Sequence, residues 1–279
     1  MKISIAVPSL NQGSFLGTCL ESIRTQTHED FEALIADGGS TDASREIIDE
    51  YVKRDGRFRL VSVSDQGQAD AVNKALALAT GDIHCFLNAD DQFLCSDAFE
   101  AIVSAFLGYS TMSIVSFTGW SIDERGHPVR RLRLRYHPRD NFEWMQRRTA
   151  VVQPATFWRA EVTRRLPFRA ELQYAFDSWF FYEAYRAFGW IELEKPVAGA
   201  RLQAGSKSLG IRSERISEFA RLETFKYGPG SWRGAYLHLV SGLVGVAGAI
   251  PVAGPFLQRT IYVTVNALAY LSFYRLPSM

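Results

Sequence analysis

Residues 31–42 read FEALIADGGSTD, and this stretch decides the fold. An apolar, strand-forming run from Phe31 to Ala36 ends at Asp37, and a Gly-Gly-Ser-Thr-Asp turn follows. Short runs of this kind are typical of strands buried on both faces. Glycine, serine, threonine and aspartate are the residues that end a strand and begin a helix. The stretch therefore predicts a strand–turn–helix unit with polar side chains at the end of its strand.

The same unit recurs along the first 118 residues. Further apolar runs lie at 3–8, 58–63 and 83–87, spaced by about 25 residues. Patterns with helical spacing lie between them at 15–23, 44–52 and 69–79. Alternating units of this length predict an α/β fold with a mostly parallel sheet flanked by helices. Ligands of such sheets bind at the carboxyl ends of the strands.

Composition narrows the class of protein. The chain has 279 residues, 47% of them hydrophobic and 22% charged, which is ordinary for a globular protein and excludes a largely disordered chain. Three cysteines (Cys19, Cys85 and Cys95) cannot form a disulfide framework, and their odd number indicates a reducing compartment. A pI near 7.7 carries no sign of nucleic-acid binding.

The net charge of +1 hides an uneven distribution. Residues 1–100 carry 8 basic and 17 acidic side chains, whereas residues 101–279 carry 23 basic and 13 acidic ones. Such asymmetry indicates that the two parts meet different partners, although solvated helix faces also account for the acidic part. Eight arginines lie between 125 and 148, and the alternation over 131–135 predicts a strand with one basic face.

The C-terminal region lacks formal charge over long stretches. Residues 234–258 contain none, and after Arg259 a further 15 residues, 260–274, contain none. A bilayer-spanning helix needs about 20 apolar residues, but Pro251 and Pro255 argue against one straight span. We expect an interfacial or re-entrant helical hairpin at an anionic membrane surface. A soluble Gly/Ala-rich hairpin or a dimer interface remains the alternative.

Acidic residues follow three of the four predicted strands, and they should meet at one edge of the sheet. Clustered carboxylates require a cation or several donors to offset their repulsion. Ligation by oxygen alone selects Mg²⁺ or Mn²⁺, whose shell substrate phosphates usually complete. Asp37 and Asp65 could instead accept hydrogen bonds from a base or a ribose. Taken singly, each aspartate is typical of a helix cap or a turn.

Four motifs in order carry a resemblance to a known family. They are VPSLN at 7–11, DGGSTD at 37–42, DQGQADAVN at 65–73 and NADD at 88–91. Together they resemble family 2 glycosyltransferases of the GT-A (Rossmann-like) fold, of the bacterial polysaccharide-biosynthesis type, over about residues 1–210. The resemblance implies an inverting, metal-dependent transfer of a sugar from a nucleotide-sugar, typically a UDP-sugar, with Mg²⁺ or Mn²⁺.

The resemblance also implies roles for individual residues. The implied nucleotide-sugar contacts are Pro8, Ser9, Asn11, Asp37, Asp65, Gly67, Gln68, Asn73, Asn88, Ala89, Asp90, Arg201 and Lys207. Arg201 or Lys207 is the implied phosphate contact, and Asp90 and its neighbour Asp91 are the implied metal ligands. Asp177 is the implied catalytic base, and a helix N-cap is the alternative for it.

Three positions depart from the family's pattern. Asn88 stands where many members have an aspartate, Gly38 stands where they have a second acid, and Gln203 stands where they often have a histidine. Aromatic residues at 179–185 are expected in the core, as is His84, whereas Trp144 and Trp158 suit either the core or a sugar platform.

We therefore predict a GT-A domain over 1–220, with a nucleotide-sugar-binding half (1–118) and an acceptor half (119–220). An apolar, membrane-associating helical tail over 221–279 follows, with no acid after Glu223. The predicted activity is transfer to a saccharide or polyprenyl-diphosphate-linked acceptor at the cytoplasmic face of the membrane, in polysaccharide or glycolipid assembly. Nucleic acid is not an expected partner, and the oligomeric state stays open. A catalytically weak scaffold subunit and a nucleotidyltransferase are the alternatives.

Overall fold

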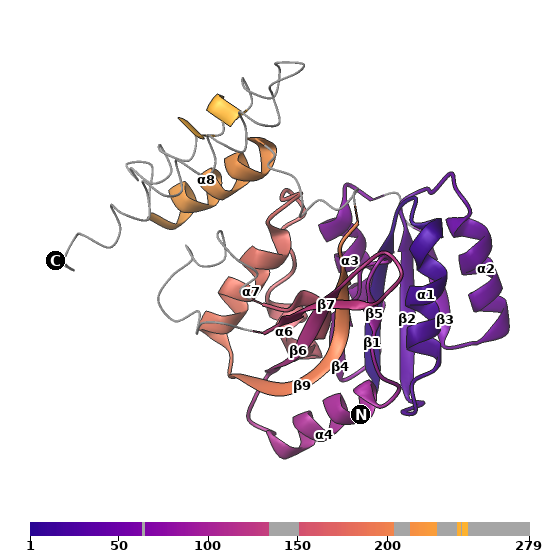
Figure 1. The fold of residues 1–279 in the computed structure, drawn as a ribbon. Coiled ribbons are helices and arrows are strands. Elements are labelled where there is room, and N and C mark those ends of the chain that lie inside the picture. The colour runs from indigo at the N-terminus through magenta and orange to yellow at the C-terminus, as the bar shows by residue number, and fades with distance from the viewer. Residues whose placement is uncertain (63–64, 134–150, 204–212, 228–238, 241, 245–279) are drawn as a thin grey trace. The chain divides into compact units, whose positions relative to one another are not determined.

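The computed structural model describes residues 1–62, 65–133, 151–203, 213–227, 239–240 and 242–244 (Figure 1). The chain divides into two compact units, and each is described by itself. The first comprises residues 1–172 and 176–203, and the second comprises 173–175 with 204–279. Residue 220, the predicted domain boundary, lies within the helix Ser213–Tyr227, and the division of the chain into functional domains stays a prediction.

The predicted alternation of strands and helices is confirmed in the first half of the chain. Its elements are β1 (Ile3–Ser9), α1 (Gly13–Arg24), β2 (Phe31–Asp37), α2 (Ser44–Arg54), β3 (Phe58–Ser62), α3 (Gln68–Ala77) and β4 (Ile83–Phe86). Every residue of β1, β2 and β4 is buried. Strands covered on both faces need apolar side chains in both directions, which explains their continuous apolar runs.

The remainder of the first unit extends the same sheet. Its elements are β5 (Gln92–Phe93), α4 (Ala98–Gly108), β6 (Ile114–Ile122), β7 (Pro128–Leu132), the 3₁₀ turn η1 (Gln153–Ala155), β8 (Thr156–Arg159), α6 (Ala160–Arg165), α7 (Phe176–Ala187) and β9 (Trp190–Arg201). The predicted basic strand at 131–135 corresponds to β7, which begins earlier and ends at Leu132. Residues 134 and 135 lie outside the described ranges.

Among the described residues the sheet has nine strands in the order β3-β2-β1-β4-β8-β6-β9-β5, with β7 paired to β6. Strands β3, β2, β1 and β4 are parallel, and β8 runs antiparallel to β4. In this register Ser9 lies opposite Asp37, and Asp37 lies opposite Ser62. The ends of the parallel strands therefore meet at one edge, as the sequence predicts.

An aromatic cluster forms the core between β8 and α7. Trp158 is fully buried and packs on Phe168, Phe180 and Phe181. Phe168 and Phe180 stack with ring centroids 4.1 Å apart. Trp158 is thus a core residue rather than a sugar platform. His84 is also buried, as expected, and Trp144 lies outside the described residues.

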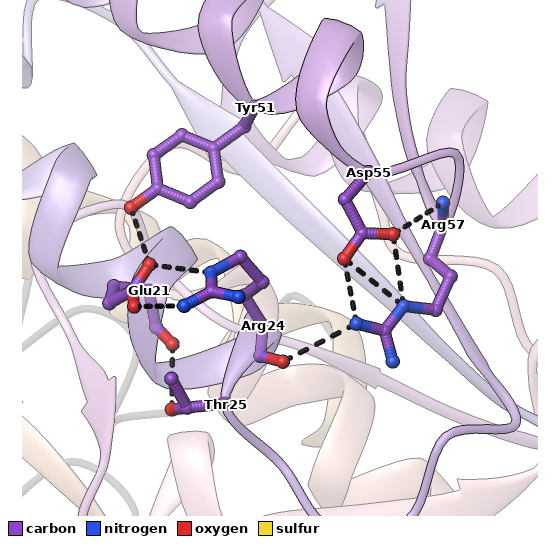
Figure 2. A network of polar contacts seen from close by, with 6 residues as sticks. All are labelled: Glu21, Arg24, Thr25, Tyr51, Asp55 and Arg57. Atoms are coloured by element: carbon purple, nitrogen blue, oxygen red, sulfur yellow. Dashed lines mark hydrogen bonds and ion pairs between the residues drawn. The ribbon is translucent and has the colours of Figure 1, made fainter.

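A polar network ties α1 to α2 and to the turn before β3 (Figure 2). Glu21 accepts hydrogen bonds from Arg24 at 2.6 and 2.8 Å and from the Tyr51 hydroxyl at 3.0 Å. Arg57 pairs with Asp55 at 2.7 Å and reaches the Arg24 carbonyl at 3.4 Å. The hydrogen bonds from Arg24 lower the pKa of Glu21 to about 2, and burial raises the pKa of Tyr51 to about 12.

The second unit contains helix α8 (Ser213–Tyr227) and a short helical stretch at residues 239–240 and 242–244. In that stretch Val240 and Val244 are buried, whereas Leu239 and Leu243 are 62% and 45% exposed. Most of the predicted apolar tail lies outside the described residues. Among the helices that are described, none combines the length and the hydropathy needed to cross a bilayer.

Candidate functional site

The loops after β1 and β2 brace each other. Asp37, at the end of β2, accepts hydrogen bonds from the Ser40 backbone N–H (3.1 Å) and hydroxyl (2.5 Å). The N–H of Asn11 donates to Ser40 Oγ at 2.9 Å, and Asn11 Oδ1 accepts from the Thr41 N–H at 2.8 Å. Asn11 has a φ of 52°, a left-handed conformation that asparagine tolerates better than most residues. Two predicted nucleoside contacts, Asn11 and Asp37, therefore share one preorganised loop pair.

Ser9, the last residue of β1, has a buried hydroxyl group without a hydrogen-bond partner among the described residues. The residue is 5% exposed, and within the described part of the chain its Oγ has no hydrogen-bond partner. The Ser9 carbonyl accepts the Gly38 N–H at 2.9 Å, so the carbonyl has a partner where the hydroxyl has none within the described ranges. An unpaired buried hydroxyl is unfavourable. A ligand at this edge of the sheet would supply the missing partner.

Gly38 makes room for Asp65. A Cβ added at Gly38 would lie 3.0 Å from Asp65 Oδ2, closer than nearly all real Cβ contacts. Asp65 Oδ1 in turn accepts the Gly67 N–H at 3.1 Å. Gly67 has a φ of 123°, which residues with side chains rarely adopt, and α3 begins at the next residue. The glycine that replaces the family's second acid therefore leaves the space in which the Asp65 carboxylate lies.

Asn88 is the centre of an amide network beyond β4. Its Oδ1 accepts from Gln68 Nε2 at 2.7 Å, and its Nδ2 donates to Asp91 Oδ2 at 3.1 Å and to Gln153 Oε1 at 3.2 Å. Gln153 Nε2 donates to the Phe86 carbonyl at 2.6 Å. An aspartate at position 88 could not donate to both acceptors. The links of Gln153 to Asn88 and to the Phe86 carbonyl have no signal in the local sequence, because they exist only after folding.

The two adjacent aspartates have different surroundings. Asp91 is buried, and its oxygens accept from the Arg201 N–H (2.8 Å) and from Asn88 (3.1 Å). Burial, and then the neighbouring Asp90 carboxylate, raise the pKa of Asp91. Asp90 is partly exposed, and its Oδ2 accepts from Gln203 Nε2 at 2.7 Å. Asp90 is therefore the better placed of the two predicted metal ligands.

Arg201, predicted to contact phosphate, is bound mainly by the protein. The side chain donates to the carbonyls of Asp90, Asp123 and Glu124 and to Gln92 Oε1, at 2.7 to 2.9 Å. A guanidinium has five N–H groups, and these contacts engage four of them. Arg201 therefore holds the loop at Asp90 in place. The phosphate contact stays a prediction, which these hydrogen bonds disfavour.

The other predicted residues occupy several settings. Asn73 clamps the backbone of Phe168, donating to its carbonyl at 2.7 Å and accepting its N–H at 2.9 Å. Pro8 and Ala89 are buried beside the loops described above, and Lys207 lies outside the described residues.

Asp177 is the second residue of α7 and is partly exposed. It therefore lies inside the helix and not at the N-cap. Its Oδ1 accepts the Ser178 N–H at 2.6 Å. Carboxylates in the first turn of a helix interact favourably with the helix dipole. The predicted role of Asp177 as a base stays a prediction.

The residues present fit a divalent cation shared with substrate phosphates. Within the described ranges no group of three or more His, Cys, Asp or Glu is placed to hold a metal ion. Mg²⁺, however, is commonly bound by only one or two carboxylates plus phosphate oxygens and water. Asp90 would supply such a carboxylate, and the amides of Gln203 and Gln12 lie beside it.

Comparison with known proteins agrees with this architecture. The sequence model of Glycosyl transferase family 2 matches residues 4–166. A PGL/p-HBAD biosynthesis glycosyltransferase of Mycobacterium tuberculosis is 42% identical over 106 residues, which make up 38% of this chain and 41% of the mycobacterial protein. The chain thus matches less than half the length of that relative.

Two solved structures share the fold. S. aureus TarS 1–349 in complex with UDP-GlcNAc is 17% identical, with a TM-score of 0.63 over 98% of this chain and 92% of that chain. The mannosyltransferase PcManGT from Pyrobaculum calidifontis, in complex with GDP-Man and Mn²⁺, is 20% identical, with a TM-score of 0.58 over 96% of this chain and 75% of that chain.

Proposed function

Because the chain belongs to glycosyl transferase family 2, we propose that it transfers a sugar, with inversion, from a nucleotide-sugar to a hydroxyl group of a saccharide acceptor. The observation that carries the proposal is the edge where β1, β2 and β4 end. There the parallel strands bring together Asp37, Asp65, the Asn88–Asp90 loop and the Ser9 hydroxyl, which has no partner among the described residues. Parallel α/β sheets bind nucleotides at this position.

The proposed donor is a UDP-sugar. Asp37 and the Ser9 hydroxyl suit the hydrogen-bonding groups of a base and a ribose, and Asp90 suits a cation on the diphosphate. TarS was solved with UDP-GlcNAc and PcManGT with GDP-Man, so both nucleotides belong in the test.

The proposed chemistry separates two tasks. Ser9, Asp37 and Asp65 hold the nucleotide. Asp177 removes the proton of the acceptor hydroxyl as the hydroxyl oxygen attacks the sugar from the face opposite the leaving diphosphate. A divalent cation at Asp90 would offset negative charge on the diphosphate. Positioned general bases contribute about 10²–10⁴-fold to rate.

A thermal-shift panel of UDP, GDP and their sugars with Mn²⁺ tests the donor. Ligand at 100 times its Kd stabilises a native protein by about 2.7 kcal/mol. Because the proposed donor is a UDP-sugar, UDP should bind more tightly than GDP and raise Tm more at the same concentration. Ser9→Ala should shrink the UDP-dependent shift without lowering Tm in the absence of nucleotide, because the Ser9 hydroxyl has no hydrogen-bond partner among the described residues. Ser116→Ala is the matched control, since it deletes a buried hydroxyl that is bonded to Thr156 at 2.9 Å. It should lower Tm and keep the nucleotide shift.

Radiolabelled transfer to saccharide acceptors completes the test. Nucleotide binding with no transfer to any soluble or lipid-linked acceptor, and no hydrolysis of the donor, would favour the scaffold alternative. Absence of nucleotide binding would contradict the proposal.

We further propose that the acceptor is lipid-linked and that the second unit contacts the cytoplasmic face of the membrane. Leu239 and Leu243 support this, because they lie four residues apart on a helical stretch and are 62% and 45% exposed. Beyond Glu223 the chain has basic residues but no acids, and anionic lipids attract such segments.

Vesicle sedimentation of the full chain tests membrane contact. We expect binding to phosphatidylglycerol vesicles that exceeds binding to phosphatidylcholine vesicles, and a clear loss in Leu239→Glu/Leu243→Glu. Leu107→Glu is the control, because Leu107 is 64% exposed on α4 of the other unit. Equal binding by both variants would contradict this part of the proposal.

A further inference from the structure

Glu218 of α8 makes an unusual set of contacts within the second unit. The residue is 3% exposed. Its Oε1 accepts the backbone N–H of Gln173 at 2.6 Å, and its Oε2 accepts those of Tyr174 at 2.8 Å and Ala175 at 3.0 Å. Three consecutive backbone N–H groups thus converge on one buried carboxylate.

A carboxylate is the side chain that suits this arrangement. It offers two acceptor oxygens and no donor, and charge-assisted hydrogen bonds of this kind are stronger than neutral ones. Successive backbone N–H groups that point inward form an anion-binding concavity. An amide of the same shape would turn an NH₂ group toward at least one N–H donor. The contact therefore depends on the charge as well as on the shape of Glu218.

The segment that Glu218 holds leads directly into α7. Phe176, the first residue of the helix, follows Ala175, and Asp177 comes next. Two peptide units link Ala175 to Asp177, so their Cα atoms lie within about 7 Å of each other. The segment 173–175 is therefore the immediate N-terminal neighbour of the first turn of α7, which contains Asp177.

We propose that Glu218 is a positioning residue for Asp177. This inference rests on the proposed function, in which Asp177 is the general base. Through its carboxylate, Glu218 fixes the three residues before α7 and holds the base in line with the acceptor hydroxyl. Displacement of a catalytic group by about 1 Å can cost about 10²-fold in rate.

The kinetic test compares Glu218→Gln with Glu214→Gln. Glu214 is exposed one turn earlier on the same helix, so its variant removes the same charge without the three contacts. We expect kcat of Glu218→Gln to fall about 10- to 100-fold while the KM for the nucleotide-sugar stays within about twofold, and Glu214→Gln to match the wild type. Glu218→Asp keeps the charge and should recover part of kcat. A wild-type kcat in Glu218→Gln, or a loss confined to KM, would overturn the proposal.

A double-mutant cycle separates positioning from general stabilisation. If Glu218 acts through Asp177, adding Glu218→Gln to Asp177→Asn should lower the residual rate by less than twofold. A further fall as large as in the single variant would show an independent role and overturn the proposal. Circular dichroism and a cooperative melt establish that each variant is folded. If Glu218→Gln is not folded, Glu218→Asp takes its place in the cycle.

Hydrogen exchange gives a readout that does not need activity. Peptides covering 173–178 should exchange at least tenfold faster in Glu218→Gln than in wild type or Glu214→Gln, while peptides from β1 and β2 are unchanged. Unchanged exchange at 173–178 would overturn the inference, whatever the activity. Faster exchange in a protein with no transferase activity would instead contradict the proposed function and leave the backbone contact established.

Discussion

Gln203 donates a hydrogen bond from Nε2 to Asp90 Oδ2 at 2.7 Å, across 113 residues of sequence. The same amide lies 3.4 Å from Gln12 Oε1. The position where the family often has a histidine thus provides a neutral amide to the predicted metal carboxylate. One side of Asp90 is therefore occupied by protein, and its environment is less charged than the sequence NADD suggests.

Replacing that amide with a second carboxylate should create a stronger cation site. In EDTA, Gln203→Glu should lower stability by on the order of 1 kcal/mol, because a donor is lost and like charges adjoin. Mn²⁺ should then raise the Tm of the variant more than that of the wild type. Leu202→Glu adds the same charge at the neighbouring exposed position and serves as control. Equal Mn²⁺ shifts in both variants would argue against a site at Asp90.

Asp177→Asn tests the general base. The variant keeps an oxygen that can accept the Ser178 N–H, so Tm should stay near the wild-type value. Turnover should fall about 10²–10⁴-fold, with the donor KM unchanged. Steady-state transfer kinetics measure this. Asp49→Asn, on the outer surface of α2 and paired to Arg45, should be as active as the wild type, and near-normal turnover in Asp177→Asn would remove the assignment.

Two glycine-to-alanine changes should affect different properties, one of them UDP binding and the other the stability of the fold. At Gly38 a methyl group would meet Asp65 Oδ2 at 3.0 Å, so Gly38→Ala should displace that carboxylate and weaken UDP binding by about tenfold, or about 1.4 kcal/mol. At Gly17, inside α1, an added Cβ would meet no other heavy atom of the described residues within 4 Å, so Gly17→Ala should raise stability by roughly 0.5–1 kcal/mol without changing binding. Calorimetric titration and urea unfolding measure the two effects. Tighter UDP binding in Gly38→Ala would contradict the described packing.

Acid should weaken the network at Glu21. Its folded-state pKa of about 2 lies below its ordinary value of 4.5. The contribution is therefore fully present above about pH 4.5 and is lost as pH falls toward 2. The Glu21 side chain is 42% exposed, so solvent screening keeps the effect at about 1 kcal/mol or less. Urea unfolding between pH 6 and 3 should show a shallower loss in Glu21→Gln than in wild type, and Glu50→Gln on the exposed surface should follow the wild type.

Sequence patterns were sufficient for the parallel half of the sheet. Strands buried on both faces need uninterrupted apolar runs, and the turns that follow them need glycine and small polar residues. Each strand–turn unit can therefore be recognised from consecutive residues, such as 31–42. The meeting of Ser9, Asp37 and Asn88 at one edge follows from topology alone. The strands and turns could be predicted because they depend on neighbours in the chain, and the shared edge could be predicted because parallel strands end on the same side of a sheet.

Other parts of the site depend on contacts between distant residues. The sequence marks Asp90 and Asp91 alike, yet folding buries Asp91 against the Arg201 backbone and leaves Asp90 beside Gln203. Arg201 resembles a phosphate ligand until its carbonyl partners are known. By itself the sequence determined that the first strands are parallel, the family, and the polar residues at the strand ends. Only the tertiary structure decided which of those side chains still have hydrogen-bonding capacity, because burial and pairing across more than a hundred residues leave no local pattern.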